Sequence, residues 1–274
     1  MDAYNDKAKV RNHYDLVSPY YQALWGDHLH HGYWICGDET KERAQAQLVE
    51  HLAQAANIPP GARLADIGCG FGGSSIQLAK THGVRAVGIT ISPVQAKMAA
   101  EAARAAGVDA PFLVMDAEAL GFARESFDVV WSLESISHYQ RKMEFFTSAV
   151  ALLRPGGVFA ILDWFRKPGL DRSAYEKSLR PIERGMMVSL DTMDDYASLL
   201  ERNGLRVTRR EILNDRCAKT WDLCLEIIRK KEFWTLALKL GPEFVHFLEA
   251  FQAMKSGFAS GHFIYGLLVA KKTA

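Results

Sequence analysis

The sequence predicts an α/β protein in which a doubly wound, Rossmann-like sheet of seven strands carries a helical cap. Three observations support this fold. Between about residues 61 and 163, short apolar runs alternate with segments of helical spacing, as in a parallel sheet with helices on both faces. A glycine-rich turn follows the first apolar run. Two further strand-like runs, at 205–213 and 262–270, flank a mostly helical insertion.

Within the alternating region, each expected element follows from its own local pattern. Ser92 and Pro93 begin an alanine-rich helix as N-cap and first helical residue. Pro155, Gly156 and Gly157 end the helix that precedes the fifth strand. Strands are expected at 62–67, 85–91, 110–115, 127–133 and 158–164, and helices at 73–82, 93–106 and 143–153.

The segments outside this region are expected to form a cap over the carboxyl edge of the sheet, and a separate domain is the alternative. Residues 164–190 contain two prolines and two glycines and are long enough for a lid. The expected organisation is an N-terminal helical flap at 1–57, a core at 58–163, the lid at 164–190, and a completion of the core at 191–274 that contains a helical cap insertion at about 216–258.

Bulk composition narrows the class of protein. A net charge of +1 gives no indication of nucleic acid or a polyanionic partner. No apolar run approaches the roughly 18 residues of a membrane span, and the first six residues do not resemble a signal peptide. The four cysteines lack C-x-x-C spacing and are expected to be reduced thiols in a cytoplasmic protein. A homo-oligomer remains open.

The glycine-rich turn reads Asp66-Ile67-Gly68-Cys69-Gly70-Phe71-Gly72-Gly73. Glycine is needed where the backbone approaches a ligand closely or takes a positive φ. The run also satisfies G-x-G-x-x-G, so a dinucleotide site is an alternative. Such sites carry an acid about 20 residues later, where this chain has Gly88-Ile89-Thr90. The third interpretation is a glycine turn that binds nothing.

With Asp66 two residues before the first glycine, the turn resembles motif I of class I S-adenosylmethionine-dependent methyltransferases. The next strand ends in Gly88-Ile89-Thr90-Ile91-Ser92-Pro93-Val94-Gln95, a pattern similar to the cyclopropane-synthase and tocopherol-methyltransferase branches. This resemblance implies that Thr90 and Gln95 share the ribose, although Gln95 could instead be a solvated helix residue. The cofactor residues expected from the resemblance are Asp66, Gly68, Gly70, Thr90, Ile91, Gln95, Asp116, Ala117, Leu133 and His138.

Asp116 ends the third strand, and by the same resemblance its carboxylate takes the adenine amino group, while the backbone of Ala117 or Glu118 meets the ring. The alternative is that Asp116 only caps the following turn. The fourth strand is followed by Glu134 and His138, at the edge where open α/β sheets bind ligands. These two are the candidate catalytic residues, because a carboxylate or an imidazole can remove a proton near neutral pH. For either residue, positioning a ligand is the alternative role, and packing beside the cofactor is an equal alternative for His138.

The N-terminal segment is dense in aromatic residues and histidines, which favours a flap that excludes water over the cofactor. A packed aromatic cluster is the alternative. A metal site at His28, His30 and His31 is not expected, since no carboxylate or cysteine completes a ligand set. The substrate and lid residues expected here and at the end of the fifth strand are Tyr14, Tyr20, Tyr21, Trp25, His31, Trp164 and Phe165.

A closer resemblance rests on Trp25–Tyr33, Gly72–Ser75, Trp131–Ser135 and the tail that contains Tyr265. These segments look like the γ-tocopherol methyltransferase family, which methylates an aromatic ring carbon of a phenol and has relatives that methylate nitrogen or oxygen. Two departures from related patterns matter. Ser137 replaces a family glutamate, and His31 stands where cyclopropane synthases carry a cysteine, so cyclopropanation is not expected.

The expected protein is therefore an S-adenosyl-L-methionine-dependent methyltransferase whose last strand is antiparallel. C-methylation of an aromatic or prenylated natural product is favoured, with N- or O-methylation of an alkaloid or phenol as the alternative. A nicotinamide-dependent oxidoreductase and a non-catalytic cofactor-binding protein are the alternatives from other classes. A hydrophobic acceptor is favoured because the cap is rich in aromatic residues, namely Trp164, Phe165, Trp221, Phe233, Trp234, Phe244, Phe247 and Phe251.

Overall fold

The computed structural model, which describes residues 4–241 and 243–273, contains one seven-stranded sheet. Its strand order is β3-β2-β1-β4-β5-β7-β6, and β7 runs antiparallel to both of its neighbours. The predicted fold class is thus confirmed. Residues 1–3, the start of the segment that does not resemble a signal peptide, lie outside the described residues. The strands are β1 (Arg63–Ile67), β2 (Arg85–Thr90), β3 (Phe112–Val114), β4 (Phe127–Leu133), β5 (Leu153–Arg166), β6 (Leu205–Ile212) and β7 (Phe263–Lys272).

Two strands differ from their predicted lengths by more than one residue. β5 begins at Leu153, because the pairing of β4 with β5 shifts register between Phe127 and Val129 and the proline–glycine segment is included in the strand. β3 has only three residues and lies at the edge of the sheet, where Val114 is exposed. As an edge strand, β3 pairs with β2 on one side, and only Phe112–Val114 take part in that pairing.

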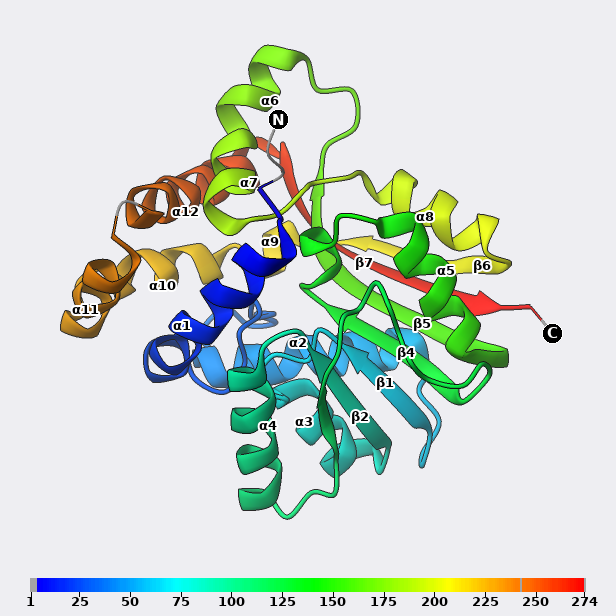
Figure 1. Cartoon of the computed structure of the whole chain (residues 1–274). Coiled ribbons are helices and arrows are strands. Elements are labelled where there is room, and N and C mark those ends of the chain that lie inside the picture. Colours follow the sequence, from blue (N-terminus) through cyan, green and yellow to red (C-terminus); the bar gives the residue numbers. More distant parts are fainter. Residues whose placement is uncertain (1–3, 242, 274) are drawn as a thin grey trace.

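Alternate residues along the strands divide the sheet into two apolar faces. One face packs Leu64 and Trp164 with the helices α2 (Lys41–Ala56) and α3 (Gly73–His82) and with the cap. The other packs Phe165 with α5 (Lys142–Leu152) and α8 (Met193–Arg202). The helix α4 (Pro93–Ala105) follows β2. Within residues 1–57, the helix α2 packs on the sheet, whereas α1 lies beside the cap helices (Figure 1).

The remaining helices gather beyond one edge of the sheet, at the left and top of Figure 1. There α12 packs against α7, and α1 packs against α11. No helix among the described residues is long and apolar enough to cross a membrane. The helices outside the two packed faces are α1 (Lys7–Trp25), α6 (Arg172–Ser178), α7 (Arg180–Met186), α9 (Asn214–Cys217), α10 (Lys219–Ile227), α11 (Lys231–Leu240) and α12 (Glu243–Ser260). A 3-10 turn, η1 (Ile136–His138), follows β4.

Candidate active site

A continuous cavity lies between the carboxyl ends of the strands and the cap. The ends of β1, β2, β4 and β5 contribute one wall, and α1, α10, α11 and α12 contribute the other. Sixteen of the eighteen residues predicted for the site line this one space, although they come from positions scattered between 14 and 164. They are Tyr14, Tyr21, Trp25, His31, Asp66, Gly68, Gly70, Thr90, Ile91, Gln95, Asp116, Ala117, Leu133, Glu134, His138 and Trp164.

The other two predicted residues, Tyr20 and Phe165, do not line the cavity. Phe165 is fully buried on the opposite face of the sheet, 4.9 Å from the ring of Tyr196. Its neighbour Trp164 faces the cavity, and successive residues of a strand cannot share a face. Tyr20 adjoins Tyr21 on α1, where one residue turns the side chain by about 100°. Placing these neighbours together was therefore wrong.

The glycine turn after β1 is shaped for close approach. Gly68 has φ +81°, and a Cβ added there would lie 2.3 Å from Ser135 Cβ and Oγ. The amides of Gly68 and Cys69 both donate to Ile89 O, at 2.9 Å, which ties the turn to β2. Asp66 is buried beside it and accepts a 2.6 Å hydrogen bond from Ser75 Oγ. Burial raises the pKa of Asp66 to about 7, although the Ser75 hydrogen bonds act in the opposite direction.

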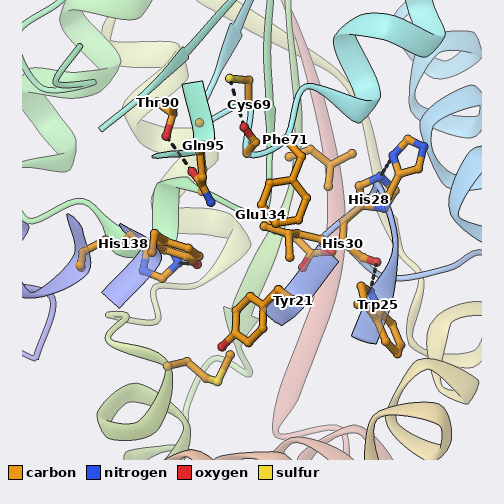
Figure 2. Close-up of a pocket in the computed structure, with 18 of the residues that line it drawn as sticks. Tyr21, Trp25, His28, His30, Cys69, Phe71, Thr90, Gln95, Glu134 and His138 are labelled. Carbon is orange, nitrogen blue, oxygen red and sulfur yellow. Dashed lines mark hydrogen bonds between the residues drawn. The ribbon is translucent and has the colours of Figure 1, made fainter. Parts of the chain in front are cut away.

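Thr90 and Gln95 form a polar pair at the end of β2. Thr90 Oγ1 donates to Gln95 Oε1 at 2.7 Å, and Figure 2 shows this bond at the upper wall of the cavity. Gln95 is 4% exposed, so it is not a solvated helix residue. Ser92 caps α4, because its side-chain oxygen accepts a hydrogen bond from the backbone N–H of Gln95. The Ser92 hydroxyl also donates to Asp15 of α1 at 2.5 Å. The first helix of the cap is therefore fastened next to this pair.

Asp116 lies beyond Thr90 along the same wall. One oxygen of Asp116 accepts from the Glu118 amide at 2.9 Å, which is the local turn cap that the sequence allowed. The other accepts from Lys7 Nζ at 2.7 Å, and Lys7 also pairs with Glu118 at 2.6 Å. Sequence reasoning missed Lys7, because no local pattern links a residue on α1 with the third strand. The side chain of Asp116 still borders the cavity.

Glu134 follows β4 with a positive φ of +52°, a strained conformation for a residue with a side chain. Its Oε1 accepts three hydrogen bonds, from His31 N at 2.8 Å, His31 Nδ1 at 2.9 Å and Tyr265 Oη at 2.7 Å. Burial alone would raise the pKa of Glu134, but the charge and hydrogen bonds of His31 outweigh it and lower the pKa. Glu134 is therefore held as a carboxylate. Tyr265 was missed as a site residue, although the alternation of β7 places it with Leu267 and Val269 on the cavity face.

His138 is buried as a neutral imidazole. Met187 O can only accept a hydrogen bond, so the Nδ1 that lies 3.0 Å from it carries the proton. Nε2 is then an acceptor, and Tyr14 Oη donates to it at 3.0 Å. Burial lowers the pKa of His138 to about 4, against a smaller opposing effect of the bond to Met187. Figure 2 shows Glu134 between His138 and His30 in this view.

The remaining histidines of the segment after α1 bond to one another. His30 Nδ1 donates to His31 O at 2.8 Å, which leaves its Nε2 to accept from His28 Nδ1 at 2.9 Å. Within residues 4–241 and 243–273, no group of three or more histidine, cysteine or acidic side chains could hold a metal ion.

The part of the cavity under the cap is apolar. Its polar atoms are few, and His31 stacks on Tyr265 with ring centroids 4.3 Å apart. Besides Phe165, two of the aromatic residues expected there lie elsewhere: Trp234 is 52% exposed on α11, and Phe244 is buried without lining the cavity. The cap residues that line this part include Leu24, Met186, Trp221, Ile227, Phe233, Leu236, Phe247 and Phe251.

Comparisons with known proteins agree with this geometry. The family model described as mycolic acid cyclopropane synthetase matches residues 2–246. The 27-O-demethylrifamycin SV methyltransferase of Amycolatopsis mediterranei (strain S699) is 35% identical over 218 residues, covering 78% of this chain and 79% of the relative. The 2-methyl-6-phytyl-1,4-hydroquinone methyltransferase of Synechocystis sp. (strain ATCC 27184 / PCC 6803 / Kazusa) is 36% identical over 221 residues, covering 74% and 67%.

The tocopherol resemblance is confirmed as well. The chloroplastic tocopherol O-methyltransferase of Arabidopsis thaliana is 28% identical over 286 residues, covering 96% of this chain and 81% of the relative. Among solved structures, the mycolic acid cyclopropane synthase CmaA1 complexed with SAH and CTAB has a TM-score of 0.86 and 22% identity, covering 97% of this chain and 98% of that one. That likeness supports the fold.

Proposed function

The chain is a class I S-adenosylmethionine-dependent methyltransferase of the mycolic acid cyclopropane synthetase family, and from this premise we propose that it methylates a carbon atom of a hydrophobic aromatic or prenylated small molecule. The cofactor supplies an electrophilic methyl group on a sulfonium. The observation that carries the choice of carbon is the buried, neutral His138, whose pKa is near 4.

The residues at the strand ends fit the cofactor. Gly68 takes a positive φ and packs against Ser135 where a Cβ would collide, and in this tight turn it borders the cavity, so its backbone can approach a ligand closely. The Thr90–Gln95 pair offers a buried hydroxyl and amide suited to ribose hydroxyls. Asp116 offers a carboxylate to an exocyclic amine. We propose these roles together with Asp66, Gly70, Ile91, Ala117 and Leu133 as the remaining contacts.

The acceptor side fits a flat, apolar molecule. Aromatic and aliphatic side chains of the cap line the cavity, and few polar atoms among them could pair with a strongly hydrated substrate. The hydroquinone and tocopherol named for two relatives are acceptors of this kind, which supports a phenolic or prenylated acceptor here.

The strength of the base supports carbon over oxygen. Methylating a ring carbon gives a cation that loses its proton readily, so a weak base suffices. Deprotonating a neutral phenol, with a pKa of about 10, requires a stronger base than an imidazole whose pKa is near 4. In this proposal the ring proton passes to Tyr14 Oη while Tyr14 gives its own proton to His138 Nε2, along the existing 3.0 Å bond.

Methyl transfer from isotope-labelled S-adenosylmethionine tests the proposal. We would supply γ-tocopherol, simple phenols, indole alkaloids and tertiary-amine precursors, and locate the label by NMR and mass spectrometry. Label on a ring carbon is the expected result, and label on oxygen or nitrogen would move the enzyme to another branch of its family. Changing His138 to Ala should lower kcat while the affinity for S-adenosylhomocysteine stays unchanged. An unaltered kcat in a folded variant would exclude His138 as the proton acceptor.

A further inference from the structure

Among the described residues, the Glu134 carboxylate accepts hydrogen bonds through one of its two oxygens. All three of its hydrogen bonds, from the His31 amide, the His31 ring and the Tyr265 hydroxyl, converge on Oε1. Oε2 accepts no hydrogen bond from any residue that the structure describes. It is also not among the fully enclosed polar atoms that lack a partner, so it is open to the cavity that Glu134 lines.

An open oxygen of a buried carboxylate needs a donor. The lowered pKa keeps Glu134 ionised despite its burial, and an ionised carboxylate can only accept hydrogen bonds. Leaving such an atom unpaired in an apolar space is costly. The donor expected at Oε2 therefore belongs to a molecule that enters the cavity.

The surroundings of Glu134 indicate which molecule this is. Its partners His31 and Tyr265 stack on each other at 4.3 Å, and the ring of Trp221 meets His31 at 4.7 Å. His31 and Trp221 line the cavity, whereas Tyr265 is fully buried and reaches Glu134 from within the protein. The stacked rings hold Glu134 in place, while the apolar and aromatic side chains that line the cavity can accept a flat ring and the carboxylate can accept its hydroxyl.

We propose that Glu134 Oε2 binds the phenolic hydroxyl of the acceptor and that Tyr265 and His31 are positioning residues for it. This inference rests on the proposed function and names the group by which the acceptor is recognised. The hydrogen bond draws negative charge toward the phenol oxygen and so into the ring, which makes the neighbouring carbon a better nucleophile. That carbon forms the new bond to the methyl group, the sulfonium carbon–sulfur bond breaks, and the ring proton leaves through Tyr14 to His138.

Positioning follows from the geometry of Oε1. Three donors fix this oxygen while the backbone is held at φ +52°, so Oε2 has one direction available to it. Removing the Tyr265 hydroxyl leaves the stacked ring in place but frees the carboxylate to rotate. The effect on acceptor binding should then be smaller than that of losing the charge itself.

Equilibrium binding tests the proposal without requiring turnover. We would load the protein with S-adenosylhomocysteine, add γ-tocopherol or its methyl ether, and follow quenching of the tryptophans that line the cavity. Since a hydrogen bond to a charged group is worth a factor of about ten or more, the wild type should bind the free phenol at least about tenfold more tightly than the ether. Glu134→Gln should reduce this preference to nearly one, and Tyr265→Phe should reduce it partly. Tyr196→Phe is the matched control, because Tyr196 is a buried tyrosine on the other face of the sheet.

Three results would overturn the proposal. Equal affinity of the wild type for the phenol and the ether would exclude the hydrogen bond from the phenol to Oε2 without any variant. If Glu134→Gln weakened S-adenosylhomocysteine binding by about tenfold or more but kept the preference for the phenol over the ether, Oε2 would be assigned to the cofactor. If the wild type bound neither probe, the phenolic acceptor and its hydrogen bond to Oε2 would both be rejected. Labelled methyl transfer to an amine or an alcohol would separate that failure from a loss of the methyltransferase function.

Discussion

The two ends of the cavity are built in different ways. At the end proposed for the cofactor, the wall is formed by residues close in sequence: the turn from Asp66 to Gly73, and Thr90 with Gln95. At the acceptor end, Tyr14, His31, Trp164, Trp221 and Phe247 come from five separated segments. Backbone shape and polar pairs dominate the first, and apolar side chains dominate the second.

This difference explains why the two ends carry different information. A polar or glycine-dependent contact restricts the residue at its position, so a short motif is enough to identify the ligand. Apolar contacts restrict only volume and shape, and many side chains satisfy them. The same chain can thus show its cofactor plainly while its acceptor must be inferred from the few polar atoms present, Glu134 and His138.

The largest expected effect breaks the cofactor end alone. Replacing Gly68 with Ala places a Cβ 2.3 Å from Ser135 at a φ of +81°, and we expect the affinity for S-adenosylhomocysteine to fall by about 100-fold. Isothermal titration calorimetry measures it. Gly61→Ala is the control, because Gly61 also has a positive φ but open space around it. Unchanged affinity in Gly68→Ala would show that the turn does not meet the cofactor.

The next effect concerns the acceptor end. Trp221→Ala removes an indole that lines the cavity, and the lost apolar contact should weaken γ-tocopherol binding by about tenfold or more. Trp234→Ala removes the same group from the outside of α11, where it is 52% exposed, and should leave binding unchanged. Calorimetry with S-adenosylhomocysteine should give wild-type affinity for both. A cofactor loss in Trp221→Ala would mean that the two ends are not independent.

A smaller effect is expected from the polar pair at the ribose position. Thr90→Val keeps the shape but removes the hydroxyl that donates to Gln95 at 2.7 Å. Losing one neutral hydrogen bond should weaken S-adenosylhomocysteine binding by roughly threefold to tenfold. Thr81→Val, on the exposed surface of α3, is the control. If Thr90→Val instead weakened γ-tocopherol binding to protein saturated with S-adenosylhomocysteine, the Thr90–Gln95 pair would belong to the acceptor end of the cavity.

The last prediction concerns the pH dependence of stability and not the affinity for a ligand. The pKa of His138 is lowered to about 4 from 6.5, so the unfolded chain binds a proton there before the folded one does. The stability from this shift is present above pH 6.5 and is lost as the pH falls to about 4. Urea unfolding at several pH values should therefore show wild type losing more stability than His138→Gln within this window. Parallel curves would mean that His138 titrates normally.

Most of the fold and of the cofactor end could be predicted from the sequence, because both depend on local patterns. The alternation of strands and helices predicted the sheet, and the ten residues expected to bind the cofactor all line the cavity. The failures have geometric causes. Phe165 was placed beside Trp164 although strand neighbours face opposite sides. Lys7 and Tyr265 were missed because their partners, Asp116 and Glu134, lie more than a hundred residues away.

The central claim is that the methyl group goes to a ring carbon, and a doubly labelled reaction tests it most directly. We would incubate the enzyme with methyl-labelled S-adenosylmethionine and γ-tocopherol deuterated at its unsubstituted ring position. The mass of the product would then be measured by mass spectrometry. Methylation at carbon replaces that deuterium, so the account predicts a product with the labelled methyl group and no ring deuterium. A product that carries the labelled methyl group and keeps the deuterium would contradict it.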